Sequence, residues 1–124
     1  LTNLGWIALH QSDLPRAVRA ATQSLLLCYQ LKEPEVLAEN LEMLAIAAAR
    51  QGHAGRGACL GGAAEALWQS MGVLRFHANH TARAHAEAVS LMQQQLTENP
   101  FAAAWQQGRT MSLESVVAMV AASP

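Results

Sequence analysis

The chain has 124 residues, of which 52% are hydrophobic, and its formal net charge at pH 7 is −1. This length is sufficient for one domain, and the apolar half of the composition is sufficient for a core. With Lys32 as its only lysine, the chain offers no basic face for a phosphate backbone, which argues against nucleic acid as a partner of this segment.

The chain contains an internal repeat, because residues 1–31 return in register as residues 41–71. Small residues align with small residues, and long apolar residues align with long apolar ones. The identical pairs are Leu1 and Leu41, Leu4 and Leu44, Ala8 and Ala48, Gln11 and Gln51, Arg16 and Arg56, and Leu27 and Leu67. A period of about 40 residues is typical of helical solenoids, in which each hairpin needs neighbours to bury its apolar face.

Repeat 1, residues 1–31, predicts a hairpin of two helices over residues 2–11 and 14–31. Asp13 is expected to accept backbone N–H groups as the N-cap of the second helix. Pro15 falls in the first turn of that helix, where its missing donor costs nothing. Small residues that allow paired helix backbones to approach closely occur in both copies, at Gly5, Ala8, Ala17, Ala45, Ala48 and Gly57.

Repeat 2, residues 34–72, predicts a second hairpin that begins at Pro34 and turns at Gly52. Its two helices are expected over residues 35–51 and 54–71. Gly61 and Gly62 lie in the middle of the second helix, where each costs about 1 kcal/mol of helix propensity relative to alanine. We expect a close helix crossing to compensate, because nothing here resembles a phosphate-binding loop that ends in Gly-Lys-Ser/Thr.

The rest of the chain predicts three more helices. A long helix over residues 79–98 carries a stripe of apolar residues at helical spacing. A capping hairpin follows over residues 99–122, with Asn99 as N-cap, Pro100 as the first helical residue and Ser112 as the cap of the last helix. We expect this hairpin to be a degenerate repeat that closes the stack.

The small and large residues of repeat 1, Leu4 and Gly5 followed by Ala8, Ala17 and Ser24, resemble the pattern of the tetratricopeptide repeat (TPR). Gly52 with residues 56–67, FAAAW at 101–105, Gly108-Arg109 and residues 112–116 resemble the end of the repeat region in large bacterial ATP-dependent transcriptional regulators, of the LuxR-type and maltose-regulator-like kind, with related regulators and cyclases. The resemblance covers nearly the whole chain and departs between Val73 and His85. It implies an all-α fold of TPR-like antiparallel helical hairpins in a short right-handed solenoid with a C-terminal helical cap.

The resemblance also implies a function. The chain would be a non-catalytic regulatory module that binds a protein or a small-molecule inducer, and a fragment of a larger cytoplasmic regulator whose ATP-binding domain lies upstream. The alternative is a freestanding TPR scaffold that binds a peptide segment in its concave groove. A Walker-type loop upstream would distinguish the first hypothesis from the second.

By the same resemblance, the residues that face the groove are Thr2, Trp6, Leu9, His10, Glu39, Glu42, Ile46, Ala49 and Arg50. Trp6 is the first of them to test, although it fits a core position equally well. Trp68 and Trp105 are expected in the core or the cap.

The N-terminal end of the stack is expected to expose an apolar face, because a solenoid that lacks a preceding repeat leaves the covered surface of its first helix open. The residues of that face are Leu1, Leu4 and Ile7. They would allow the chain to form a homodimer.

The sequence predicts no catalytic site and no cofactor, because its acidic residues are scattered singly along helices. Glu65 is expected to pair with an arginine such as Arg16 or Arg56. Cys28 and Cys59 are expected to be buried, reduced thiols. No apolar run is long enough to cross a membrane, and no signal peptide is present.

His77, His80 and His85 form the only cluster of metal-ligating residue types. On one helix, His80 and His85 would lie on opposite sides of His77, so the three side chains cannot converge on one ion. We expect no metal site here.

Overall fold

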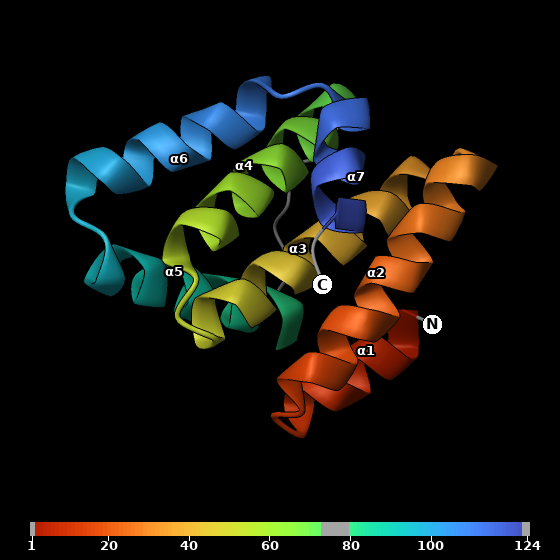
Figure 1. Cartoon of the computed structure of the whole chain (residues 1–124), viewed down its shortest axis with the longest axis horizontal. Coiled ribbons are helices and arrows are strands. Elements are labelled where there is room, and N and C mark those ends of the chain that lie inside the picture. The colour runs from red at the N-terminus through yellow and green to blue at the C-terminus, as the bar shows by residue number, and fades with distance from the viewer. Residues whose placement is uncertain (1, 73–79, 123–124) are drawn as a thin grey trace.

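The computed structural model describes residues 2–72 and 80–122, and every regular element within these ranges is an α-helix. The helices, shown in Figure 1, are α1 (Thr2–His10), α2 (Leu14–Leu31), α3 (Pro34–Arg50), α4 (Ala54–Ser70), α5 (His80–Gln95), α6 (Glu98–Thr110) and α7 (Leu113–Ala122). The all-α prediction is confirmed. None of these helices combines the length and the apolar character that crossing a bilayer requires.

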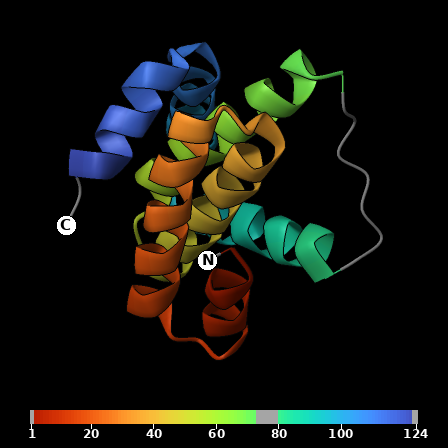
Figure 2. The ribbon, with the colours of Figure 1, turned by 90° about the vertical axis from the view of Figure 1, so that its right-hand side faces the viewer.

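Helices α2, α3 and α4 pack on one another in chain order and form the central layer of the molecule (Figure 1). Helix α3 also contacts α1 and α5, so its residues from Leu37 to Ala49 are almost all buried. Figure 2 shows α5 and α7 on opposite sides of this layer. The two sides of the layer therefore present different surfaces.

The turns of the two copies have the same backbone geometry. Ser12 and Gly52, which align in the repeat, both have positive φ, at 61° and 84°. The backbone N–H groups of the residues that follow them, Asp13 and His53, donate to carbonyl oxygens at the same step back in the chain, each at 2.8 Å. The equivalence extends from sequence to backbone conformation.

The second turn of each copy matches as well. Lys32 and Gly72 align in the repeat and have φ of 57° and 71°. Their N–H groups donate to the carbonyl oxygens of Tyr29 and Gln69, at 3.3 and 3.0 Å. Both helices of each copy thus end in the left-handed conformation that commonly stops an α-helix.

Two of the three predicted helix caps are confirmed. The Asp13 carboxylate accepts the backbone N–H of Arg16 at 3.4 Å, and the Ser112 hydroxyl accepts that of Ser115 at 3.1 Å. The prediction for α6 is wrong, because extended backbone at Thr97 makes that residue the N-cap and the helix begins at Glu98. Asn99 and Pro100 lie within the first turn, where the missing N–H of a proline still costs no intrahelical bond.

Helices α4 and α6 cross at backbone contact, which confirms the role expected for the mid-helix glycines. A Cβ atom at Gly62 would collide with the carbonyl oxygen of Trp105, and one at Gly108 would collide with that of Cys59. A Cβ atom at Gly61 would lie 2.6 Å from the Trp105 ring. At Gly62 and Gly108 only glycine fits without a shift of one helix, whereas at Gly61 the Trp105 side chain would have to move.

The last three helices cover different parts of the central layer. Helix α5 contacts α3 and α4, α6 packs mainly along α4, and α7 contacts α2 and α4. The segment expected to form a capping hairpin, residues 99–122, forms two helices that diverge from their connection and pack on α4 and α2 (Figure 1). The contact of α7 with α2 brings the end of the chain against repeat 1.

Candidate ligand-binding pocket

Four residues of the predicted groove are buried inside the molecule. They are Leu9, Glu42, Ile46 and Ala49. The expectation that these side chains line an open groove is wrong, because α3 is enclosed by α1, α2, α4 and α5. Of the others, Trp6 and Glu39 are half-buried, His10 and Arg50 are exposed, and the side chain of Thr2 lies outside the described residues.

Glu42 and Arg50 have structural contacts. The indole N–H of Trp68 donates to the Glu42 carboxylate, which is only 3% exposed. Trp68 is buried, as expected for a core residue. The Arg50 guanidinium donates to the carbonyl oxygen of Leu9 at 3.1 Å, and so satisfies an acceptor in the last turn of α1. The first contact joins the two helices of repeat 2, and the second joins repeat 2 to repeat 1.

The apolar face expected at the N-terminal end is present in part. Leu4 and Ile7 are 49% and 51% exposed, whereas Leu1 lies outside the described residues. Self-association through this face stays a prediction.

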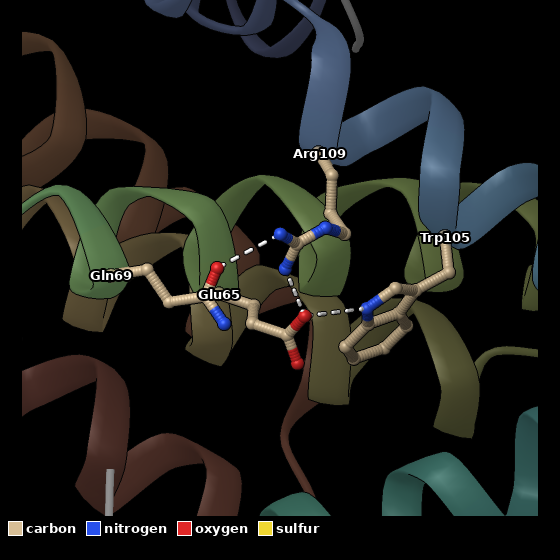
Figure 3. A network of polar contacts seen from close by, with 4 residues as sticks. All are labelled: Glu65, Gln69, Trp105 and Arg109. Carbon is tan, nitrogen blue, oxygen red and sulfur yellow. Dashed lines mark hydrogen bonds and ion pairs between the residues drawn. The ribbon is translucent and has the colours of Figure 1, made fainter. Parts of the chain in front are cut away.

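The partner of Glu65 is Arg109 of α6, not Arg16 or Arg56 (Figure 3). The same carboxylate oxygen accepts the indole N–H of Trp105 at 3.4 Å, and the guanidinium also donates to Gln69 at 2.8 Å. The prediction was wrong because α6 lies along α4 and presents its own arginine to this face. All four side chains in Figure 3 join α4 to α6, which indicates a docking contact.

The histidines and cysteines do not form a site in the part of the chain that the structure describes. His77 and the His80 side chain lie outside it, and the His85 ring meets the edge of Trp105 with centroids 6.2 Å apart. No three His, Cys, Asp or Glu side chains within that part are placed to share a metal ion. Cys28 and Cys59 are buried free thiols, as expected.

Cys59 lies where α4 meets α6, and its thiol contacts the Met111 sulfur at 3.5 Å. Burial raises the pKa of this thiol, and the nearby Arg56 guanidinium opposes that shift in part. A thiol with a raised pKa is a poor nucleophile, so Cys59 is a packing residue.

A pocket of about 650 Å³ lies between α2, the end of α3, the start of α4 and α7. Its apolar wall consists of Pro15, Val18, Leu44, Ala48 and Val120. Its polar residues are Arg19, Thr22, Gln23, Gln51, His53 and Arg56. The pocket therefore contains residues of both repeats and of the last helix, on the side of the central layer that faces away from α5.

The charge of the pocket has one sign. Arg19 and Arg56 line it, and no carboxylate does. Neither guanidinium has a hydrogen bond or ion pair with any described residue. Arg56 is half-buried and Arg19 is exposed. Two cationic groups without acidic partners favour an anion in the space between the helices.

A second, more open hollow lies between α5 and α6, with a volume of about 500 Å³. It is lined by His85, Phe101 and Trp105 among others, and the last two rings have centroids 5.7 Å apart. It contains no lysine, arginine or carboxylate. We regard the first pocket as the candidate site because it is less open and combines an apolar wall with charged groups.

No family model, no curated protein and no solved structure matches the chain. The site therefore rests on its own geometry. Nothing in the sequence indicates that Arg19, His53 and Val120 are neighbours. The alignment of Arg16 with Arg56 places arginines at the same position of both repeats, but the pocket forms only where α7 docks on α2.

Proposed function

We propose that the chain is a non-catalytic, TPR-like regulatory module that binds a small ligand in the pocket between α2, α4 and α7. The observation that carries this proposal is the composition of the pocket wall. Val18, Ala48 and Val120 come from repeat 1, repeat 2 and the last helix, respectively. A ligand in this place contacts all three parts at once, and so favours the arrangement in which they are together.

The larger setting is part of the same proposal. The resemblance of residues 52–67 and 101–116 to bacterial LuxR-type regulators supports a cytoplasmic parent protein with an ATP-binding domain, whose activity the ligand would control as an inducer. The matched turns at Ser12 and Gly52 support a TPR-like solenoid. His53 is the one histidine that lines the pocket, and no carboxylate or thiol lines it beside His53 to complete a catalytic pair, which supports binding without catalysis.

The alternative, a freestanding scaffold that binds a peptide in the groove formed by α1 and α3, has weaker support. Leu9 and Ile46 would be its apolar contacts, and both are buried by neighbouring helices. A peptide could not reach them without displacing a helix.

A thermal-shift screen of small metabolites tests the proposal with one pocket variant and one matched control. Val18→Trp places an indole in the pocket, because Val18 lines it and is half-buried. Leu27→Trp makes a similar change on the same helix, at an exposed position away from the pocket. We expect compounds that raise the Tm of the wild type and of Leu27→Trp but not that of Val18→Trp. Compounds that stabilise all three proteins equally would contradict the proposal.

A further inference from the structure

We infer that the pocket takes an amphiphilic organic anion, with its acidic group on Arg19 and Arg56 and its apolar body against Val18, Leu44 and Val120. This inference rests on the proposed function, because it assigns the chemical class of the ligand to the same pocket. The acidic group is a carboxylate or a phosphate, which arginine binds with the same paired N–H geometry.

The positive charge of the pocket is the first observation that supports an anionic ligand. Arg19 belongs to α2 and Arg56 to α4, so two separate helices each supply one guanidinium to a common pocket. Elsewhere in the described chain, Arg83 and Arg109 each pair with a glutamate and Arg50 donates to the Leu9 carbonyl oxygen, whereas Arg16 is exposed outside the pocket. Arg19 and Arg56 have no such partner among the residues described. An anion that enters the pocket offsets part or all of this positive charge.

The apolar wall is the second part of the argument. Pro15 is exposed and Val18 is half-buried, so these two residues present most of the accessible apolar surface of the wall, whereas Leu44, Ala48 and Val120 are each at most 3% exposed. A bare inorganic ion would leave this wall in water, whereas a ligand with a hydrocarbon or aromatic body covers it. The volume of about 650 Å³ is in the usual range for pockets that hold such molecules.

A neutral apolar ligand fits less well. It would cover the apolar wall but would provide no hydrogen-bond acceptor for Arg56. The half-buried Arg56 guanidinium would then lose contact with water without gaining a partner. Binding should therefore depend strongly on the charge of the ligand, and this dependence can be measured.

Two fluorescent probes with the same aromatic body separate charge from shape. Anilinonaphthalene sulfonate carries an acidic group, and N-phenylnaphthylamine is its neutral counterpart. We expect the wild-type protein to bind one sulfonate probe per chain, and to bind it at least about tenfold more tightly than the neutral probe. Equal affinity for the two probes would overturn the inference.

Substitutions then locate the charge effect. We expect Arg19→Gln and Arg56→Gln each to lower the affinity for the sulfonate probe about tenfold and to leave the affinity for the neutral probe unchanged. Arg16→Gln is the control, since Arg16 is an exposed arginine on α2 that does not line the pocket. It should change neither affinity. If both pocket variants bind the sulfonate as tightly as the wild type, the inference is wrong.

Competition identifies the acidic group. Octanoate or octyl phosphate should displace the sulfonate probe, and the stronger competitor indicates whether carboxylate or phosphate is preferred. Octanol, with the same chain and no charge, should not displace it, and displacement by octanol at the same concentration would overturn the inference.

The failure of this inference can be distinguished from failure of the proposed function. If Val18→Trp abolishes binding of both probes while the arginine variants change nothing, the pocket binds ligands but does not select anions. If Val18→Trp leaves both probes bound as tightly as before, the probes bind elsewhere, such as the hollow at Phe101 and Trp105, and both proposals are contradicted.

Discussion

Ser12 and Gly52 occupy the same position in the turns of the two repeats, and both have left-handed backbone, with φ of 61° and 84°. Glycine adopts this conformation at no steric cost, whereas other L-residues are strained there by about 1 kcal/mol. The two repeats therefore form the same turn with different residues, and only the second repeat has glycine, the favourable residue, at this position.

Replacing Gly52 tests this strain without a clash, because a Cβ atom at this position would have no neighbour within 4 Å. We expect Gly52→Ala to lower the free energy of unfolding by about 1 kcal/mol, and Ser12→Gly to raise it by up to about the same amount. Urea denaturation measures both changes.

Gly55→Ala is the matched control. This glycine also has open space around its Cβ direction, but it lies in α4 with an ordinary helical backbone. Its replacement should raise stability by up to about 1 kcal/mol. If Gly52→Ala and Gly55→Ala change stability in the same direction, the strain argument fails.

Substitutions at the crossing of α4 and α6 are expected to cause the largest losses in the free energy of unfolding. Gly62→Ala and Gly108→Ala place a methyl group against a backbone carbonyl of the opposite helix, so we expect each to cost about 3 kcal/mol. Gly61→Ala meets the Trp105 ring, a side chain that can shift, and should cost less. Urea denaturation ranks the three variants. Equal losses at all three positions would contradict the distinction between backbone and side-chain neighbours.

The two tryptophan–glutamate contacts should differ in strength because they differ in burial. Trp68→Phe removes the donor to the buried Glu42 carboxylate, and we expect a loss of about 2 kcal/mol that does not depend on salt. Glu65→Gln weakens a pair whose side chains are 43% and 30% exposed, so it should cost under about 1 kcal/mol. High salt should reduce the loss of stability caused by Glu65→Gln and should not change the loss caused by Trp68→Phe. Denaturation at low and high sodium chloride checks this, and a salt-sensitive effect at Trp68 would contradict it.

Cys59 should make stability depend on pH in the alkaline range. Burial raises its pKa in the folded protein, so the preference of the folded state for the protonated thiol is fully present below the ordinary thiol pKa. That contribution is lost as pH rises from the ordinary value through the folded one. We expect wild-type stability to fall more steeply than that of Cys59→Ala as pH rises above the ordinary thiol pKa of about 8.5.

A second variant checks the electrostatic part of this shift. The Arg56 guanidinium lowers the pKa of the Cys59 thiol, so Arg56→Gln should raise that pKa further, which makes the loss of stability larger and extends it to higher pH while its onset stays at the ordinary thiol pKa. Parallel pH curves for the wild type and Cys59→Ala would contradict the role of this thiol.

The sequence alone was sufficient for features that depend on residues within one or two turns of one another. Asp13 and Ser112 cap their helices as predicted, and the seven helices within residues 2–72 and 80–122 lie close to their expected ranges. The mid-helix pair Gly61 and Gly62 correctly indicated a close crossing, because its cost in helix propensity required a compensating contact.

Only the tertiary structure decided which surfaces meet. The alanine-rich faces of these helices are similar to one another, so the pattern did not distinguish α6 as the partner of α4, or Arg109 as the partner of Glu65. Glu42 has the polar character of a surface residue, yet enclosure of α3 on all sides buries it against Trp68. The pocket depends in the same way on the docking of α7, which places Val120 beside two arginines far away in the sequence. Local bonding determines where each helix begins and ends, whereas the partner of each face is set by competition among all the apolar surfaces of the chain.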